Sequence, residues 1–158
     1  MTTQQYTASR LLLKNIVESV ANLAGEDALT TIFNIASHKT ALELLKISNI
    51  NVRKINDPVE AFKVAYDILR NYLRFDLEDI RKLDSKILVK IRNCECIFSA
   101  PELKIMDHVK QILKSRKLCI LTLLACSLVE VFSDNVYVIE DVKCDEGNAD
   151  IVLTSELI

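Results

Sequence analysis

Hydrophobic positions recur at helical spacing through the first half of the chain. Between residues 9 and 24, and again between residues 26 and 45, apolar side chains fall every three or four positions. This pattern predicts two amphipathic helices separated at Gly25, a residue type that often ends helices. A third helix is predicted from the run Asp57-Pro58-Val59-Glu60 to about Leu73, because that run combines a capping Asp, an early Pro and a first-turn acid.

The period then changes from 3.6 to 2. In residues 86–92, Ile87, Val89 and Ile91 alternate with Lys90 and Arg92. Such alternation predicts a strand with one buried and one exposed face. Residues 76–83, just before it, are predicted to form a short helical turn capped by its first residue, an Asp.

The last third of the chain predicts two helices followed by a β-hairpin. A capping-box start at Ser99-Ala-Pro-Glu102 predicts a helix that runs to about residue 115. Residues 118–132 are apolar nearly all round, which is typical of a central buried helix. Residues 136–142 and 149–154 predict two strands, with a connecting loop at 143–148. Helices and antiparallel strands therefore segregate, and we expect an α+β fold in which N-terminal helices pack with a small antiparallel sheet and the central helix.

Length and composition narrow the class. The chain has 158 residues and a mass of 17.9 kDa, which suits a single domain over 1–158. A net charge of −2 argues against nucleic acid or an anionic membrane as partner. Two glycines, Gly25 and Gly147, are too few for a dinucleotide fingerprint or a phosphate-binding loop. Neither histidine, His38 or His108, has a nucleophile and an orienting acid at motif spacing, so we expect no enzyme.

Targeting features point to the cytoplasm. The N-terminus lacks the basic segment and apolar stretch of a secretory signal. The longest apolar run, residues 118–129, is too short to span a bilayer, where about 20 residues are needed. Five cysteines, an odd number, without a signal are typical of a reducing compartment.

The C-terminal half resembles the 4-vinyl-reductase domain, a small-molecule-binding family related in fold to the Bet-type subunits of TRAPP tethering complexes. Four segments carry the resemblance: a strand that runs into a cysteine, a buried helix that opens near a cysteine, a strand that ends in an acidic pair and a cysteine, and a glycine before a final strand. These are Lys86–Cys96, Leu118–Val129, Val136–Cys144 and Gly147–Leu153. The helices predicted from Ser9 to residue 45 and from Asp57 also lie where that family has helices.

The resemblance implies a hydrophobic ligand pocket and, commonly, a homodimer. Phenol-sensing relatives bind zinc through cysteines and a glutamate, and Cys119, Glu140 and Cys144 match three of those positions, with Asp141 giving the family's closer spacing. The last cysteine of the zinc set is absent here, where Asp150 and Ile151 stand. The simpler interpretation makes the cysteines small buried hydrophobes and the acids part of a solvated hairpin tip.

Other polar clusters have equally simple interpretations. Cys94 and Cys96 are separated by one residue, fewer than a structural zinc pair usually has, and are taken as ordinary thiols. Lys110, Lys114 and Lys117 share a helical face, which we interpret as solvated rather than as a nucleic-acid patch.

We therefore expect a non-enzymatic binding domain for a hydrophobic small molecule, acting as a homodimeric sensor or carrier. Its pocket is expected between the helix of residues 118–132 and the strands. The candidate lining residues are Leu121, Leu124, Ala125, Leu128 and Val138. The alternative is a homodimeric protein-interaction scaffold of TRAPP-Bet type with a filled pocket. The second alternative is a zinc-site protein that uses Cys119, Glu140 and Cys144.

Overall fold

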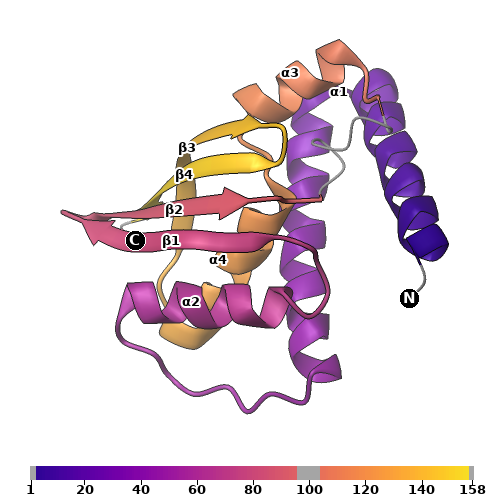
Figure 1. Cartoon of the computed structure of the whole chain (residues 1–158). Helices are drawn as coiled ribbons and strands as arrows, with labels where there is room; N and C mark the ends of the chain where they lie inside the picture. The colour runs from indigo at the N-terminus through magenta and orange to yellow at the C-terminus, as the bar shows by residue number, and fades with distance from the viewer. Residues whose placement is uncertain (1–2, 96–103, 157–158) are drawn as a thin grey trace.

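The structure, a computed structural model, describes residues 3–95 and 104–156 of the chain (Figure 1). The helices are α1 (Thr3–Ile47), α2 (Pro58–Leu69), α3 (Asp107–Ser115) and α4 (Ile120–Ser133). The strands are β1 (Asp76–Leu83), β2 (Lys86–Arg92), β3 (Tyr137–Asp145) and β4 (Asn148–Ser155). They form one antiparallel sheet in the order β1-β2-β4-β3. The expected α+β class is confirmed.

Helix α1 is two helices joined at a sharp break. Gly25 has φ 87° and ψ −179°, a conformation that is essentially restricted to glycine, so the helix direction changes there. Beyond the break, the buried face follows a spacing of four residues, Leu29, Phe33, Ser37, Ala41 and Leu45. The apolar spacing predicts a different inner face, made of Leu29, Ile32, Phe33, Ala36, Thr40, Leu44 and Leu45. The observed face is rotated from it, because Ile32 is exposed and the polar Ser37 is buried.

The prediction of a short helical turn at residues 76–83 is wrong, because this segment forms strand β1. Leu77 and Ile80 are three residues apart, which suggests a helix. A β-bulge lies between Leu77 and Asp79, and it brings both apolar side chains onto the packed face despite their odd spacing. A two-residue turn with Asp84 at φ 55° then leads into β2, which has the predicted bounds.

The C-terminal hairpin is tighter than predicted. Strand β3 continues to Asp145, and Glu146 and Gly147 alone make the turn, with φ values of 46° and 84°. Two successive positive φ values define the turn that matches strand twist best. Helix α3 begins at Asp107, later than predicted. The predicted cap at Ser99–Glu102 lies outside the described residues.

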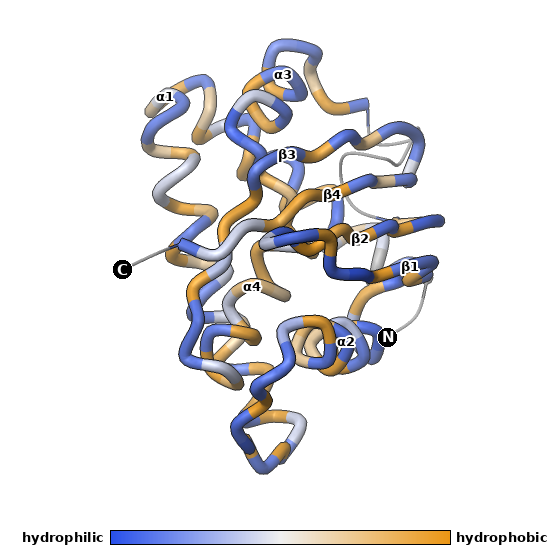
Figure 2. Tube along the Cα trace, turned by 90° about the vertical axis from the view of Figure 1, so that its left-hand side faces the viewer, coloured by the Kyte–Doolittle hydropathy of each residue, from blue (hydrophilic) through white to orange (hydrophobic). Residues whose placement is uncertain are grey.

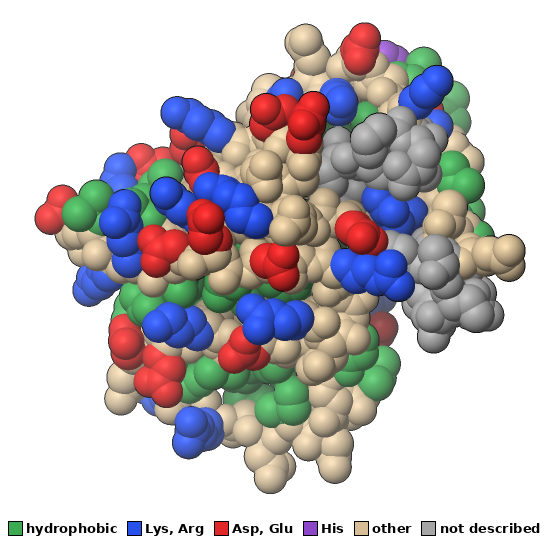
Figure 3. Space-filling view, in the orientation of Figure 1, with side chains coloured by type: hydrophobic (Ala, Val, Ile, Leu, Met, Phe, Trp, Pro, Cys, Tyr) green, Lys and Arg blue, Asp and Glu red, His purple; other side chains and the backbone are tan. Residues whose placement is uncertain are grey.

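One face of the sheet is packed and the other is solvated. Hydrophobic and hydrophilic positions alternate along the strands (Figure 2), and the inner positions Ile87, Val89, Ile91, Ile151 and Leu153 are buried against α2 and α4. The outer face carries interleaved acidic and basic side chains (Figure 3), including ion pairs of Arg92 with Glu78 and Asp150.

The helices form two connected hydrophobic clusters. The larger cluster lies among the sheet, α2, α4 and the end of α1. The smaller one joins α1 on both sides of its break to Ile105, to Val109 and Leu113 of α3, and to Leu118. Within the described part of the chain, no helix combines the length and the hydrophobicity needed to cross a membrane.

The break in α1 gives a direct prediction. The variant Gly25→Ala should lower the free energy of unfolding by about 1–3 kcal/mol, because a Cβ disfavours this backbone conformation while meeting no atom within 4 Å. Urea denaturation followed by circular dichroism measures it. Thr31→Ala, on an exposed position of the same helix, is the control and should change stability by less than about 0.5 kcal/mol. Equal stability of wild type and Gly25→Ala would show that the break is not strained for alanine.

Candidate functional site

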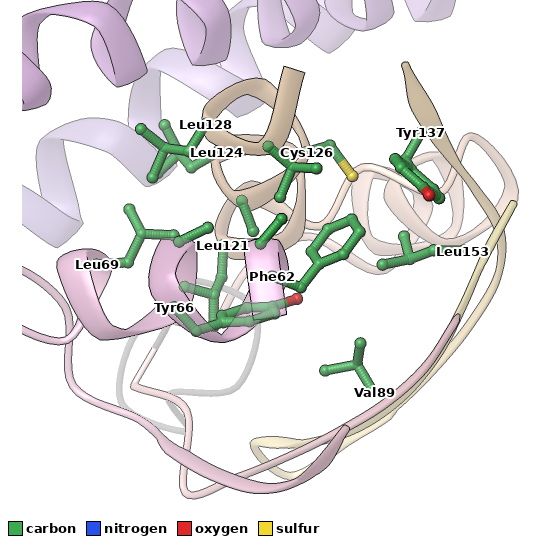
Figure 4. Close-up of a cluster of buried hydrophobic side chains, with 14 of the residues drawn as sticks. Phe62, Tyr66, Leu69, Val89, Leu121, Leu124, Cys126, Leu128, Tyr137 and Leu153 are labelled. Carbon is green, nitrogen blue, oxygen red and sulfur yellow. The ribbon is translucent and has the colours of Figure 1, made fainter. Parts of the chain in front are cut away.

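Four of the five expected pocket residues lie in a filled core. Leu121, Leu124, Ala125 and Leu128 of α4 are each at most 5% exposed. Phe62, Tyr66 and Leu69 of α2 belong to the same buried cluster as these residues of α4 (Figure 4). The space between α4 and the rest of the larger cluster is thus occupied by the chain's own side chains.

Aromatic contacts close this core from the sheet side. The ring of Phe62 meets that of Tyr137 edge-on, with centroids 5.2 Å apart, and Tyr66 meets Phe75 in the same way at 5.9 Å. Such pairs are more favourable than apolar burial alone. They fix α2 against β3 and the end of the α2–β1 connection, so the core is bounded on this side as well.

A small polar group is sealed within the core. The Tyr66 hydroxyl lies 3.4 Å from Thr122 Oγ1, and the Cys119 thiol donates to the same oxygen at 3.4 Å. Burial raises the pKa of Tyr66 well above its ordinary value. The phenol is therefore neutral. The contacts among Tyr66, Thr122 and Cys119 satisfy the hydrogen-bonding capacity of the buried hydroxyl groups, and we assign no base or nucleophile to them.

The three expected zinc ligands occupy different positions and have different neighbours. Cys119 precedes α4, Glu140 pairs with Lys86 across the outer side of the sheet, and Cys144 lies opposite Ala149 near the hairpin turn. Among residues 3–95 and 104–156, no group of three or more His, Cys, Asp or Glu side chains is arranged to hold a metal ion. The structure does not bring these three residues together as a metal site.

A cavity of about 430 Å³ opens on the other side of α4, between α1, α4 and the first part of β3. We call it the α1/α4/β3 cavity. Its apolar lining is Leu118, Leu123, Cys126, Val136, Tyr137, Val138 and Ile139. Its polar lining is Thr30, Asn34, Ser37, His38, Arg116, Lys117, Ser127 and Glu130. Val138, 40% exposed, is the one expected pocket residue among the lining residues.

Helical spacing explains this lining. Thr30, Asn34 and Ser37 repeat at four and three residues on α1, and Leu123, Ser127 and Glu130 repeat in the same way on α4. Val136 and the first three residues of β3, 137–139, line the same space although side chains alternate in direction along the strand. The cavity therefore meets the edge of β3, the outer strand of the sheet.

Charge is distributed unevenly along the cavity. Arg116 bonds Asp27 at 2.8 Å and also pairs with Glu26 at 3.6 Å, which fixes its end of the cavity beside the start of the second half of α1. Lys117, next to it, has no ion-pair partner among the described residues. Glu130 lies about 15 Å along α4 from its first residue, Ile120, at 1.5 Å of rise per residue.

Cys126 brings a thiol to the apolar wall. It is buried, and burial raises its pKa to about 12. At pH 8 roughly one molecule in 10,000 would carry the thiolate, the form that reacts. The wall therefore behaves as an apolar surface and not as a nucleophilic one.

The sequence identified few of these lining residues. Lys117 was grouped with Lys110 and Lys114 as a solvated face, yet only Lys117 of the three lines the cavity. Ser37 could have been noticed as a polar residue within a stripe of apolar ones. His108 bonds Asn22 Oδ1 through Nε2 at 2.7 Å, which ties α3 to α1, and His38 lines the cavity.

A second hollow, of about 560 Å³, lies near the hairpin turn and α3. Its lining residues are Arg92, Lys114, Val142, Lys143, Cys144, Asp145, Asn148 and Asp150. Charges of both signs line it, and Arg92 is already held by acids of the sheet. Its lining is more polar than that of the α1/α4/β3 cavity, which is therefore the stronger candidate for a hydrophobic ligand.

Comparison with known proteins supports the fold through a structural similarity at low sequence identity. No family model and no curated protein matches the chain. Among solved structures, the chain is similar to a trafficking protein particle complex subunit 3 from Naegleria fowleri covalently bound to palmitic acid. The TM-score is 0.51 at 12% identity, over 96% of this chain and 97% of that one. The TRAPP-Bet-like fold is thereby supported, whereas membership of the 4-vinyl-reductase family is not.

The buried thiol gives a second prediction. In the native protein at pH 8, Cys126 should be alkylated by iodoacetamide at least about 100-fold more slowly than in urea, because its thiolate is scarce and its sulfur is covered. Peptide mass spectrometry over a time course measures each cysteine separately. Cys144, which is only partly buried, serves as the internal comparison. Equal rates at the two positions would contradict the burial and the raised pKa.

Proposed function

We propose that this protein is a non-enzymatic, Bet-type assembly scaffold that forms a homodimer through α1, and that a hydrophobic small molecule is its additional ligand. Such a scaffold acts by binding other proteins, so we assign no catalysed reaction to this chain. In the described part of the chain, Cys94, Cys119, Cys126 and Cys144 form no disulfide, which suits a cytoplasmic site of action.

The exposed apolar surface of α1 carries this proposal. Nine of the 14 large hydrophobic residues exposed in the described part of the chain lie on this helix. They are Leu11, Leu12, Leu13, Ile16, Leu23, Ile32, Ile35, Leu42 and Ile47. Leu23 is 88% exposed and Leu12 is 62% exposed. Such a concentration on one element is typical of a protein interface.

The position of α1 makes that surface available. Its first half stands apart from the sheet and from α2 (Figure 1). This half meets the body through Val17 of the smaller cluster and through hydrogen bonds of Glu18 and Asn22 with Met106 and His108. Among residues 3–95 and 104–156, no other helix or strand covers the exposed apolar side chains of α1. A second copy, with the same apolar side chains, is the simplest cover in a symmetric dimer.

The filled interior favours a scaffold over a sensor with an enclosed pocket. Leu121, Leu124 and Leu128 pack on α2 and leave no room for a ligand between the two helices. A hydrophobic molecule is therefore assigned to the α1/α4/β3 cavity beside the core. The similar Naegleria fowleri protein holds palmitic acid, which supports a lipid-like ligand for this chain.

The dimer is tested with charged substitutions on α1. Ile16→Glu and Ile35→Glu should each weaken self-association at least about 100-fold, since a carboxylate would have to be buried in an apolar contact. Sedimentation velocity from 1 to 100 μM measures the dissociation constant. Val52→Glu, an equally exposed apolar position away from the helices, is the control and should leave association unchanged.

A wild-type protein that stays monomeric at 100 μM would contradict the homodimer. A dimer that is unaffected by either α1 variant would place the interface elsewhere. Both results are independent of any bound molecule, because apo protein is used and native mass spectrometry verifies that it carries no added mass.

A further inference from the structure

We infer that the α1/α4/β3 cavity binds, without a covalent bond, a single-chain amphiphile with an anionic head and about eight to ten carbons, its head held by Lys117. This deepens the small-molecule part of the proposed function and rests on it. The dimer through α1 does not depend on it.

The two kinds of lining surface indicate an amphiphile. One wall is apolar, built by Leu118, Leu123, Cys126 and Val138, while the α1 wall presents hydroxyl and amide groups. A volume of about 430 Å³ falls in the usual range of small-molecule sites, about 300–1,000 Å³. A wholly apolar ligand would leave the polar wall without partners, and a wholly polar one would gain nothing from the apolar wall.

The charges give the head group its sign and place. Arg116 is already neutralised by Asp27 and Glu26, so Lys117 is the cation that remains for a ligand at this end. Glu130 and His38 lie toward the opposite end, and a carboxylate there would face the charge of Glu130. An anionic head therefore belongs beside Lys117, with the chain directed along α4 toward Val138.

The length of the cavity limits the chain. Thr30 and His38, which line it on α1, are eight residues apart, or about 12 Å at 1.5 Å per residue. An extended hydrocarbon advances about 1.3 Å per carbon for ordinary single bonds. The cavity thus covers about eight to ten carbons, and the rest of a longer chain would leave it.

The thiol of Cys126 is not expected to form a covalent bond with the ligand. It lies in the wall that the chain would contact, yet burial keeps it protonated. The ligand is therefore expected to dissociate on dilution or denaturation without leaving mass on the protein.

A chain-length series tests the site. Hexanoate, octanoate, decanoate and dodecanoate are titrated into the full chain below their micellar concentrations, with isothermal calorimetry as readout. Affinity should rise about two- to fourfold per methylene up to decanoate, as for burial of CH₂ groups, and then level off. A constant rise through dodecanoate, or no saturable binding of decanoate at 1 mM, would overturn the inference.

Variants test the head group. Lys117→Gln should weaken decanoate about tenfold and leave decanol unchanged, since only the anion uses the ammonium group. Lys114→Gln makes the same charge change outside the cavity and should alter neither ligand. Glu130→Gln should not weaken decanoate; a larger loss there than in Lys117→Gln would reverse the assigned direction.

A blocking variant tests the place. Ser127 is half-buried on the cavity side of α4, and Ser127→Phe should abolish binding of both decanoate and decanol. Thermal unfolding of each variant verifies the fold. If Ser127→Phe is unfolded, the titration of Lys117→Gln with decanoate and decanol tests the site instead. Decanoate bound equally by wild type and Lys117→Gln would overturn the assignment, whereas loss of the dimer would bear only on the proposed scaffold.

Discussion

Burial of α4 is the constraint on which the rest of this structure depends. The helix is apolar nearly all round, with Leu121, Leu124, Leu128 and Phe132 all inside the protein. A helix of this kind must be covered on every side, and no single neighbour can do so. Helix α2 and the sheet cover one side, and the second half of α1 covers another. Even the end of the helix is tied, because Ile55 donates its backbone N–H to the carbonyl of Phe132 at 2.9 Å.

This constraint moves the functional surfaces away from the centre. Phe62, Tyr66 and Leu69 fill the space that they share with α4, so the chain's own side chains occupy the core between these two helices. Two surfaces remain at the margins of the core. One is the set of exposed apolar side chains on α1, which the described part of the chain leaves uncovered. The other is the α1/α4/β3 cavity, where α1 turns polar residues toward α4 and the edge of β3 completes the wall. This arrangement supports the proposed scaffold with a ligand site beside the core.

Charge distinguishes the α1/α4/β3 cavity from the solvated side of the sheet. On that side, Arg92 and Lys86 are paired with acids, and such exposed pairs contribute little to stability. Arg116 is paired as well, to Asp27 and Glu26. Lys117 differs because its neighbours are the wall residues of a cavity. The fold likeness at 12% identity fits this picture, since cores built by different side chains can support the same arrangement of helices and sheet.

The sequence by itself determined the α+β class, the break at Gly25, the start of α2 at Asp57, strand β2 and the buried helix α4. Each of these depends on local periodicity or on one residue's backbone preference. Strand β1 depended on the bulge at Leu77 and Asp79, which changes the spacing of apolar positions only when a partner strand is present. Likewise, Leu121, Leu124, Ala125 and Leu128 are recognisable as buried from their pattern, but whether a buried residue faces a ligand or a phenylalanine is decided by α2, which lies far away in the sequence. Lys117 shares a helical pattern with Lys110 and Lys114, and only the tertiary packing of α1, α4 and β3 distinguishes it from them. The physical reason is that a cavity forms between elements that are distant in the sequence, so the periodicity of a single element does not indicate it.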